Sequence, residues 1–252
     1  MSELKITNEN LKHIRLSQDV LKFIAAALML IDHSAFGLLH AYLVKNAMSI
    51  LPQTYTKLNN LYGIGRNLGR LAMPIFAFFV VEGFIKTSNL RKYILRLFVF
   101  AVISEVPFDL GLYNSFFYTD HQNVLFTFLI SLLMLAFIEW MNKTIVGLSE
   151  PVKWFATISA IIAFADVAYM LKTDYSYKGV LLIAVIYLLR ECGIFRLVAG
   201  AGVVAWEKFA PLSFLLLYFY DPDRKPKHKY FFYLFYPLHL LLIYFLAQII
   251  LF

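Results

Sequence analysis

Two ionisable residues, Asp32 and His33, stand side by side in an apolar run that extends from Leu21 to Val44. A run of this length suffices to cross a bilayer core, which takes about 20 apolar residues. A charged residue near the centre of a spanning helix costs roughly 2.5–3.5 kcal/mol on insertion scales, and such residues usually face a cavity. We therefore predict that Asp32 and His33 form the chemical centre of the protein.

Histidine suits proton transfer at neutral pH, since its unperturbed pKa is about 6.5. As a general base, His33 would take a proton from an attacking amine or hydroxyl, and Asp32 would orient its ring. A second histidine, His239, lies inside the last apolar run and is expected as partner or alternate base. This set suits acyl transfer. The residues leave open which histidine carries the proton, and a histidine that merely bonds a backbone carbonyl is the plainer alternative for each.

The composition indicates which elements must position these side chains. Of 252 residues, 61% are hydrophobic and only 15% are charged, against about 45–50% apolar and about 25% charged in soluble domains. We predict an all-α, polytopic transmembrane helix bundle that forms a single membrane domain over residues 1–252, with residues 1–18 as a cytoplasmic N-terminal arm and not a signal peptide. The charge of +7 is expected to serve topology and lipid headgroups, not nucleic acid.

Hydropathy predicts about nine spans, within a range of eight to ten, in the inner or plasma membrane. Residues 45–69 are expected to form a loop, and residues 193–220 two short helices broken near Trp206–Pro211. Most Lys and Arg then fall in loops on the side of the N-terminus, which predicts a cytoplasmic N-terminus. The expected spans are 21–44, 69–85, 93–112, 124–141, 154–171, 179–189, two within 193–220, and 230–252.

On this topology, polar residues from several spans gather in the outer half of the bundle. We expect one polar cavity there, with His239 toward its floor. A structural role in ion pairs is the alternative for its acidic members, and no spacing of His, Asp or Glu predicts a metal site. The expected supporting residues are Glu105, Asp109, Asp166 and Asp174, with Arg66, Arg70, His121 and Asn123 nearby.

Five segments carry a resemblance to a known family. They are LKFIAAALMLIDH, GRLAMPIFAFFVVEGF, RLFVFAVISEVPFDL, TDYSYKGVLLIAVIYLL and FFYLFYPLHLLL. In this order they resemble the successive motifs of the TraX family, membrane proteins named for an acetylase of pilin, and the resemblance covers nearly the whole chain. It implies transfer of an acetyl group from acetyl-CoA to an extracytoplasmic or membrane-embedded acceptor, either a pilin-like peptide N-terminus or a glycan.

The resemblance also implies roles for particular residues. An intramembrane histidine is the usual base in related membrane acyltransferases, and that role would fall on His33 or His239. Arginine binds phosphate through its planar fork, so Arg66, Arg70 and Arg96 are the candidates for holding acetyl-CoA, with structural pairing as the alternative for Arg70 and Arg96. The rival hypothesis is a transporter or flippase, in which the same buried charges form a substrate or proton pathway. A non-catalytic assembly scaffold is a third alternative.

Overall fold

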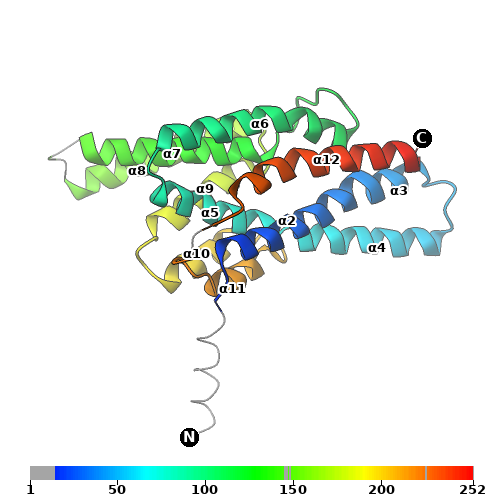
Figure 1. Ribbon diagram of the computed structural model, residues 1–252, viewed down its shortest axis with the longest axis horizontal. Coiled ribbons are helices and arrows are strands. Elements are labelled where there is room, and N and C mark those ends of the chain that lie inside the picture. The colour runs from blue at the N-terminus through cyan, green and yellow to red at the C-terminus, as the bar shows by residue number, and fades with distance from the viewer. Residues whose placement is uncertain (1–14, 145–146, 148, 225, 252) are drawn as a thin grey trace, which may run out of the picture.

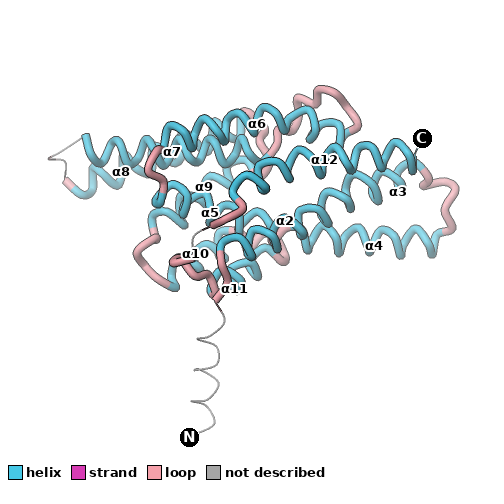
Figure 2. The backbone as a smooth tube through the Cα atoms, in the orientation of Figure 1, coloured by secondary structure: helices cyan, strands magenta, loops and turns pink. Residues whose placement is uncertain are grey.

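A computed structural model describes residues 15–144, 147, 149–224 and 226–251. Within these ranges all regular structure is helical, apart from two isolated β-bridges that join Leu16 to Tyr220 and Gln122 to Thr173 (Figures 1 and 2). The helices are α2 (Gln18–Ser34), the π-helix η1 (Ala35–His40), α3 (Ala41–Lys45), α4 (Pro52–Gly69), α5 (Ala72–Lys86), α6 (Leu90–Tyr113), α7 (Val124–Thr144), α8 (Glu150–Met170), α9 (Ser176–Leu188), α10 (Ile194–Val203), the 3-10 helix η2 (Ala210–Leu212), α11 (Ser213–Tyr218) and α12 (Lys229–Leu251).

Local sequence explains where several helices begin. The Ser17 hydroxyl accepts a hydrogen bond from the Val20 N–H at 3.3 Å and so caps α2. The Asn89 side chain accepts from the Lys92 N–H at 2.9 Å at the start of α6. Each cap satisfies one of the backbone donors that a helix leaves without an intrahelical partner in its first turn. Pro52 opens α4, where its missing N–H costs nothing.

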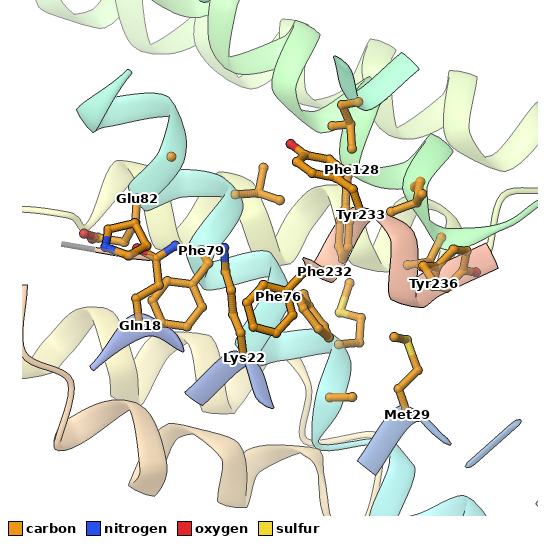
Figure 3. Close-up of a pocket in the computed structure, with 18 of the residues that line it drawn as sticks. Gln18, Lys22, Met29, Phe76, Phe79, Glu82, Phe128, Phe232, Tyr233 and Tyr236 are labelled. Atoms are coloured by element: carbon orange, nitrogen blue, oxygen red, sulfur yellow. The ribbon is translucent and has the colours of Figure 1, made fainter. Parts of the chain in front are cut away.

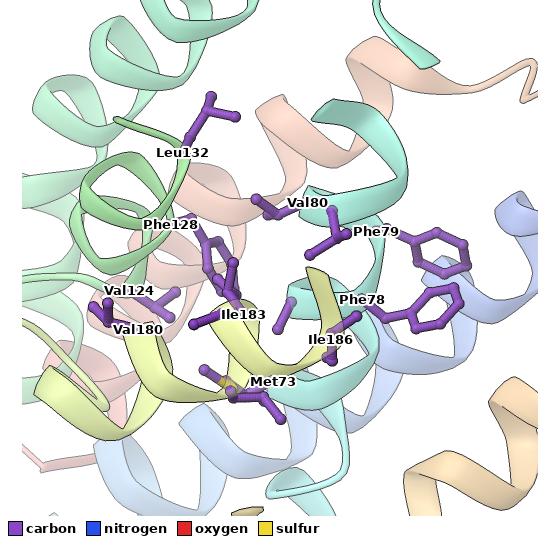
Figure 4. Packing of buried hydrophobic residues seen from close by; sticks show 14 of the residues in the cluster. Met73, Phe78, Phe79, Val80, Val124, Phe128, Leu132, Val180, Ile183 and Ile186 are labelled. Carbon is purple, nitrogen blue, oxygen red and sulfur yellow. The ribbon is translucent and has the colours of Figure 1, made fainter. Parts of the chain in front are cut away.

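The hydrophobic core lies where α5, α7 and α9 meet (Figure 4). Helix α5 is apolar on nearly every face because neighbours surround it, with α2, α7, α9 and α11 all packed against it. Around this core, α12 packs most extensively on α6 and also contacts α2 and η1. Figure 1 shows α12 between α6 and the α2–α3 segment, so the first and last spans lie side by side.

The outer faces of the bundle are apolar. On α12, for example, exposed side chains recur every three or four residues, at Leu234, Leu238, Leu242, Phe245 and Ile249. A continuous exposed apolar stripe of this kind calls for an apolar surrounding. Five described segments are long and apolar enough to cross a membrane: Gln18–Lys45, Pro52–Lys86, Val124–Thr144, Glu150–Met170 and Tyr230–Leu251. The protein is therefore a helical, multi-pass membrane protein, while nine spans and the cytoplasmic N-terminus stay predictions.

The expectation of a loop over residues 45–69 is wrong. Residues 52–69 form helix α4, which packs along α2 and continues, after a short break at Arg70 and Leu71, into α5. Its low mean hydropathy and its asparagines and glycines concealed it. Two of those glycines, Gly65 and Gly69, are buried and allow α4 to approach α2 closely.

Residues 193–220 agree with the expectation of two short helical pieces. Helix α10 ends at Val203, and helical structure resumes with η2 at Ala210 and continues through α11. The break, residues 204–209, overlaps the expected Trp206–Pro211 region. Pro211 lies inside the first turn of the second piece, where a proline is tolerated.

Candidate functional site

Asp32 and His33 occupy the last turn of α2, directly before the π-helical segment η1. A π-helical turn inside a longer helix is rare and is often found at a functional site. Three helices converge just beyond it. A Cβ added at Gly37 would lie 2.5 Å from the Gly111 carbonyl oxygen, and one at Gly111 would lie 2.6 Å from that of Leu240. Only glycine permits this approach, which brings α6 and α12 against the end of α2.

The approach places His33 against His239 on α12. The His33 Nδ1 lies 2.7 Å from the His239 Nε2, although the two histidines are 206 positions apart in the chain. Both residues are buried, with relative exposures of 7% and 4%. Sequence reasoning expected these two histidines to share a site, and this distance is that of a hydrogen bond.

The hydrogen bonds assign a tautomer to each ring. The His239 Nδ1 lies 2.8 Å from the Phe235 carbonyl oxygen, which can only accept, so this nitrogen carries the hydrogen. The Nε2 of a neutral His239 then has a lone pair and accepts from the His33 Nδ1–H. His33 is left with a lone pair on Nε2. His33 is one of the residues that border a cavity of about 690 Å³ in which a ligand can lie.

Asp32 has a partner other than the expected one. Its Oδ2 accepts a hydrogen bond from the Arg66 Nη1 at 2.8 Å, and the Arg66 guanidinium lies 5.2 Å from the centre of the Phe36 ring. Among the described residues, the group that bonds His33 is His239 and not Asp32. Gly69 makes the ion pair sterically feasible, because a Cβ there would lie 2.1 Å from the Asp32 Cβ.

The next arginine, Arg70, lies at the break between α4 and α5. It forms an ion pair with Glu207 at 3.4 Å and donates from Nη1 to the Tyr175 hydroxyl at 3.3 Å. Tyr175 and Ser176 both adopt left-handed backbone conformations, with φ of 61° and 47°. Such strain in non-glycine residues costs of order 1–3 kcal/mol each and concentrates at functional sites. Tyr175 also lines the cavity.

A cavity of about 690 Å³ connects this cluster to one end of the bundle (Figure 3). Its inner end is bordered by Asp32, His33, Asp174 and Tyr175, and its other end by Gln18, Lys86 and Arg224. Between these ends the wall is mainly aromatic. The view in Figure 3 shows Phe76, Phe79 and Phe232 around the side chain of Lys22, with Met29 and Tyr236 farther along.

The four predicted supporting carboxylates separate in space. Asp174 lines the cavity. Glu105 accepts from the Asn123 N–H at 3.1 Å and from the Asn123 side chain, and Asp109 accepts from the Tyr118 N–H at 2.9 Å, so both hold the segment that joins α6 to α7. Asp166 is exposed on α8 and does not border the cavity.

His121, from the polar segment before α7, pairs with Asp174 at 3.3 Å between Nε2 and Oδ1. The hydrogen bond that the His121 Nε2–H donates to this carboxylate, assisted by the negative charge of Asp174, raises the pKa of His121 above the ordinary value of 6.5. Burial opposes the increase only in part. The pair joins the α6–α7 segment to the turn after α8, beside the bridge of Gln122 and Thr173.

Sequence reasoning missed several residues of the cluster. Glu207 and Tyr175 belong to segments that were interpreted as breaks and turns, and Lys22 belongs to the apolar opening of α2. The available signal for Tyr175 was its place in the motif TDYSYKG, where a tyrosine stands beside Asp174. No comparable signal marks Glu207, because its partner Arg70 is 137 positions away in the chain, and only the folded packing pairs them.

The fold and the site together define a class of protein: a multi-pass helical membrane protein with a histidine pair and buried ion pairs at the end of an internal cavity. A family model described as TraX protein matches residues 17–247, so the chain belongs to the TraX family. It is also similar to the probable fimbrial assembly protein FimC, serogroup H1, of Dichelobacter nodosus. The two are 29% identical over 258 residues, which cover 92% of this chain and 96% of that protein. No solved structure matches the chain.

Proposed function

We propose that this protein is an integral membrane acetyltransferase that moves an acetyl group from acetyl-CoA to an amine or hydroxyl of its acceptor. The observation that carries the proposal is the hydrogen bond of 2.7 Å between His33 and His239 at the inner end of a cavity open to one end of the bundle. Membership of the TraX family supports it, because that family is named for an acetylase of pilin.

His33 is the general base in this proposal. Its Nε2 takes the proton of the attacking nitrogen or oxygen as that atom forms a bond to the acetyl carbon. The bond between that carbon and the thioester sulfur breaks, and the thiolate takes a proton back from the His33 imidazolium. His239 is a positioning residue, since it accepts from the His33 Nδ1–H and thereby keeps the lone pair on Nε2. The Asp32–Arg66 ion pair supports the turn that carries His33.

The acceptor is an extracytoplasmic or membrane-embedded group at the inner end of the cavity. Similarity to a protein named for fimbrial assembly favours a pilin-like peptide N-terminus over a glycan. The enzyme resides in the inner or plasma membrane, and the acetyl group reaches the acceptor through the bundle.

The test is acetyl transfer by the purified protein in nanodiscs. Radiolabelled acetyl-CoA is supplied with a peptide that carries a free N-terminal amine or with an amino sugar. Label is expected in one acceptor, and His33→Ala should lower the rate by about 10²–10⁴-fold, the contribution of a positioned general base. His40→Ala is the matched control, because His40 lies two helical turns away on η1 and does not border the cavity. Full activity in a folded His33→Ala protein would overturn the assignment.

One observation favours transport as a second candidate. Helices α4 and α5 form a discontinuous span whose break lies at Arg70, beside the cavity. Discontinuous spanning helices often bind substrates in transporters. Substrate flux into proteoliposomes without any label transfer would select this function in place of acetylation.

A further inference from the structure

Arg96 differs from the other arginines of the bundle interior. Arg66 pairs with Asp32 at 2.8 Å, and Arg196 pairs with Glu82 at 2.9 Å. Arg70 pairs with Glu207 at 3.4 Å. Arg96, on α6, has no carboxylate within ion-pair distance among the residues that the structure describes. The Nε of Arg96 is also buried and has no hydrogen-bond partner among the described residues.

The neighbours of Arg96 are neutral aromatic side chains. Its guanidinium lies 6.0 Å from the centre of the Tyr93 ring, and Tyr233 borders the same cavity. A neutral phenol can accept a hydrogen bond, but it does not supply a counter-charge. Because charges removed from water are normally paired, a cation placed in this way is suited to an anion that arrives with a ligand.

Arg96 borders the main cavity, and so does Lys22 on α2. Figure 3 shows the Lys22 side chain inside the cavity, and its Nζ lies 5.3 Å from the centre of the Phe79 ring and 5.7 Å from that of Phe232. Lys86 and Arg224 lie toward the open end of the same cavity. Lys86 pairs with Glu82 at 2.9 Å and Arg224 pairs with Asp221 at 3.2 Å, so these two basic groups already have carboxylate partners.

The position of this basic part relative to His33 fits an elongated ligand. Lys22 and His33 are eleven residues apart on α2, which corresponds to about 16 Å along the helix axis. The intervening wall is apolar and includes Met29, Phe76 and Phe128. The cavity therefore has room for a thin, largely uncharged arm between an anionic head and a reacting group.

We propose that Arg96 and Lys22 bind a phosphate group of the acyl donor, with the acyl arm extended along the aromatic wall to His33. The inference rests on the proposed acetyl transfer. It assigns different roles to the three arginines that were predicted to bind the donor. Arg66 and Arg70 already have carboxylate partners and support the site, whereas Arg96 binds the donor. Two kinds of ligand have a phosphate at the end of a long arm. In coenzyme A this is the diphosphate, and in an anionic lipid it is the headgroup.

Equilibrium binding tests the proposal. Purified wild type, Arg96→Gln and Arg96→Lys are prepared in nanodiscs of neutral lipid and titrated with coenzyme A and with pantetheine, which lacks phosphates. Arg96→Gln should weaken coenzyme A binding by about 10- to 100-fold, the value of a hydrogen-bonded charge, and leave pantetheine binding unchanged. Arg96→Lys should restore part of the affinity. Arg91→Gln, exposed on the same helix, is the matched control and should bind as wild type does.

The outcomes separate this site from the proposed reaction. Equal coenzyme A affinity in wild type and Arg96→Gln would overturn the phosphate site even if the wild type transfers acetyl groups. If wild type binds no coenzyme A but an anionic lipid binds in an Arg96-dependent manner, the phosphate site stands and acetyl-CoA as donor is wrong. Loss of affinity for pantetheine in Arg96→Gln would show a general collapse of the cavity and would also overturn the proposal. Thermal unfolding of each variant identifies such a collapse independently.

Discussion

At the scale of the residue, the site depends on which polar groups are paired. His33 and His239 bond each other, Asp32 bonds Arg66, and the Phe235 carbonyl sets the direction of the histidine hydrogen bonds. Asp32, His33 and His239 are all buried, and an unpartnered polar group costs the most in buried surroundings. Removal of one partner should therefore have larger effects than removal of both.

The histidine pair predicts a graded series at position 239. In His239→Ala the His33 Nδ1–H loses its acceptor, the ring can turn or change tautomer, and kcat should fall by about 100-fold, as for a misplaced catalytic group. His239→Gln retains an acceptor oxygen and should recover part of the rate. The measurement is kcat and KM for acetyl transfer. Equal rates for the two variants would contradict a positioning role, as would a change confined to KM.

The Asp32–Arg66 ion pair predicts a non-additive stability effect. The side chains are only 11% and 23% exposed, so Arg66→Gln leaves a buried carboxylate without its cation. Such a change typically costs about 3–5 kcal/mol of unfolding free energy. The double variant Asp32→Asn with Arg66→Gln removes both charges and should be more stable than Arg66→Gln alone. Denaturant unfolding in detergent measures the cycle, and strict additivity would show that the ion pair contributes nothing.

At the scale of the element, the α2–α4 contact positions the site. Helix α4 is not apolar enough to be recognised from hydropathy, yet it supplies Arg66 and, directly after its last residue, Arg70. Its glycines determine how closely it packs. The π-helical segment η1 has the same role on the other side, since it directs Gly37 against α6.

Two glycines of α4 predict opposite effects of the same substitution. In Gly69→Ala the new Cβ would lie 2.1 Å from the Asp32 Cβ, so the helices must separate, at a cost of about 1–3 kcal/mol or more. Gly63→Ala meets nothing within 4 Å and should stabilise the helix by up to about 1 kcal/mol. Thermal unfolding of both variants in one detergent gives the comparison. A stable Gly69→Ala protein would contradict the close approach.

At the scale of the whole molecule, the cavity relates the two ends of the bundle. Its open end is bordered by Gln18, Lys86 and Arg224, which belong to or adjoin the predicted cytoplasmic segments. Its inner end lies near Asp174, whose partner His121 comes from the predicted outer segment. A donor from the cytoplasm and an acceptor from the opposite side would thus meet near His33.

This sidedness can be measured with single cysteines. Cys192 is exposed and lies between α9 and α10, on the predicted cytoplasmic side. In intact cells a membrane-impermeant maleimide should leave Cys192 unlabelled and should label Phe116→Cys in a Cys192→Ser background, because Phe116 is exposed in the predicted outer segment. Permeabilised cells provide the control for reactivity at both positions. The reverse pattern would invert the topology.

The His121–Asp174 pair predicts a pH dependence at the opposite end. The folded-state pKa of His121 is raised, so its contribution to stability is fully present below the unfolded pKa of about 6.5 and is lost as pH rises through the higher folded-state pKa. Asp174 and Glu105 favour the charged imidazole, and Arg70 opposes it. His121→Gln should lower the melting temperature at acidic pH and have little effect at high pH. A pH-independent difference would contradict the ion pair.

The sequence by itself determined the class of protein and showed which ionisable residues lie within apolar runs. Asp32, His33 and His239 were identifiable because an ionisable side chain in an apolar run is costly wherever the run is placed. The five motifs likewise identified the family, whose model matches residues 17–247. These properties depend on residue type and order along the chain, which hydropathy reports directly.

Only the tertiary structure decided which of these groups meet. His239 lies 206 positions after His33, and Arg66 lies 34 positions after Asp32, so neither pairing leaves a signal in one sequence. Hydropathy reports depth in the membrane, but the face of each helix and its neighbours follow from close packing at glycines such as Gly69 and Gly111. For the same reason, Asp166 proved to face outward and Arg96 to lie in the cavity without a carboxylate among the described residues.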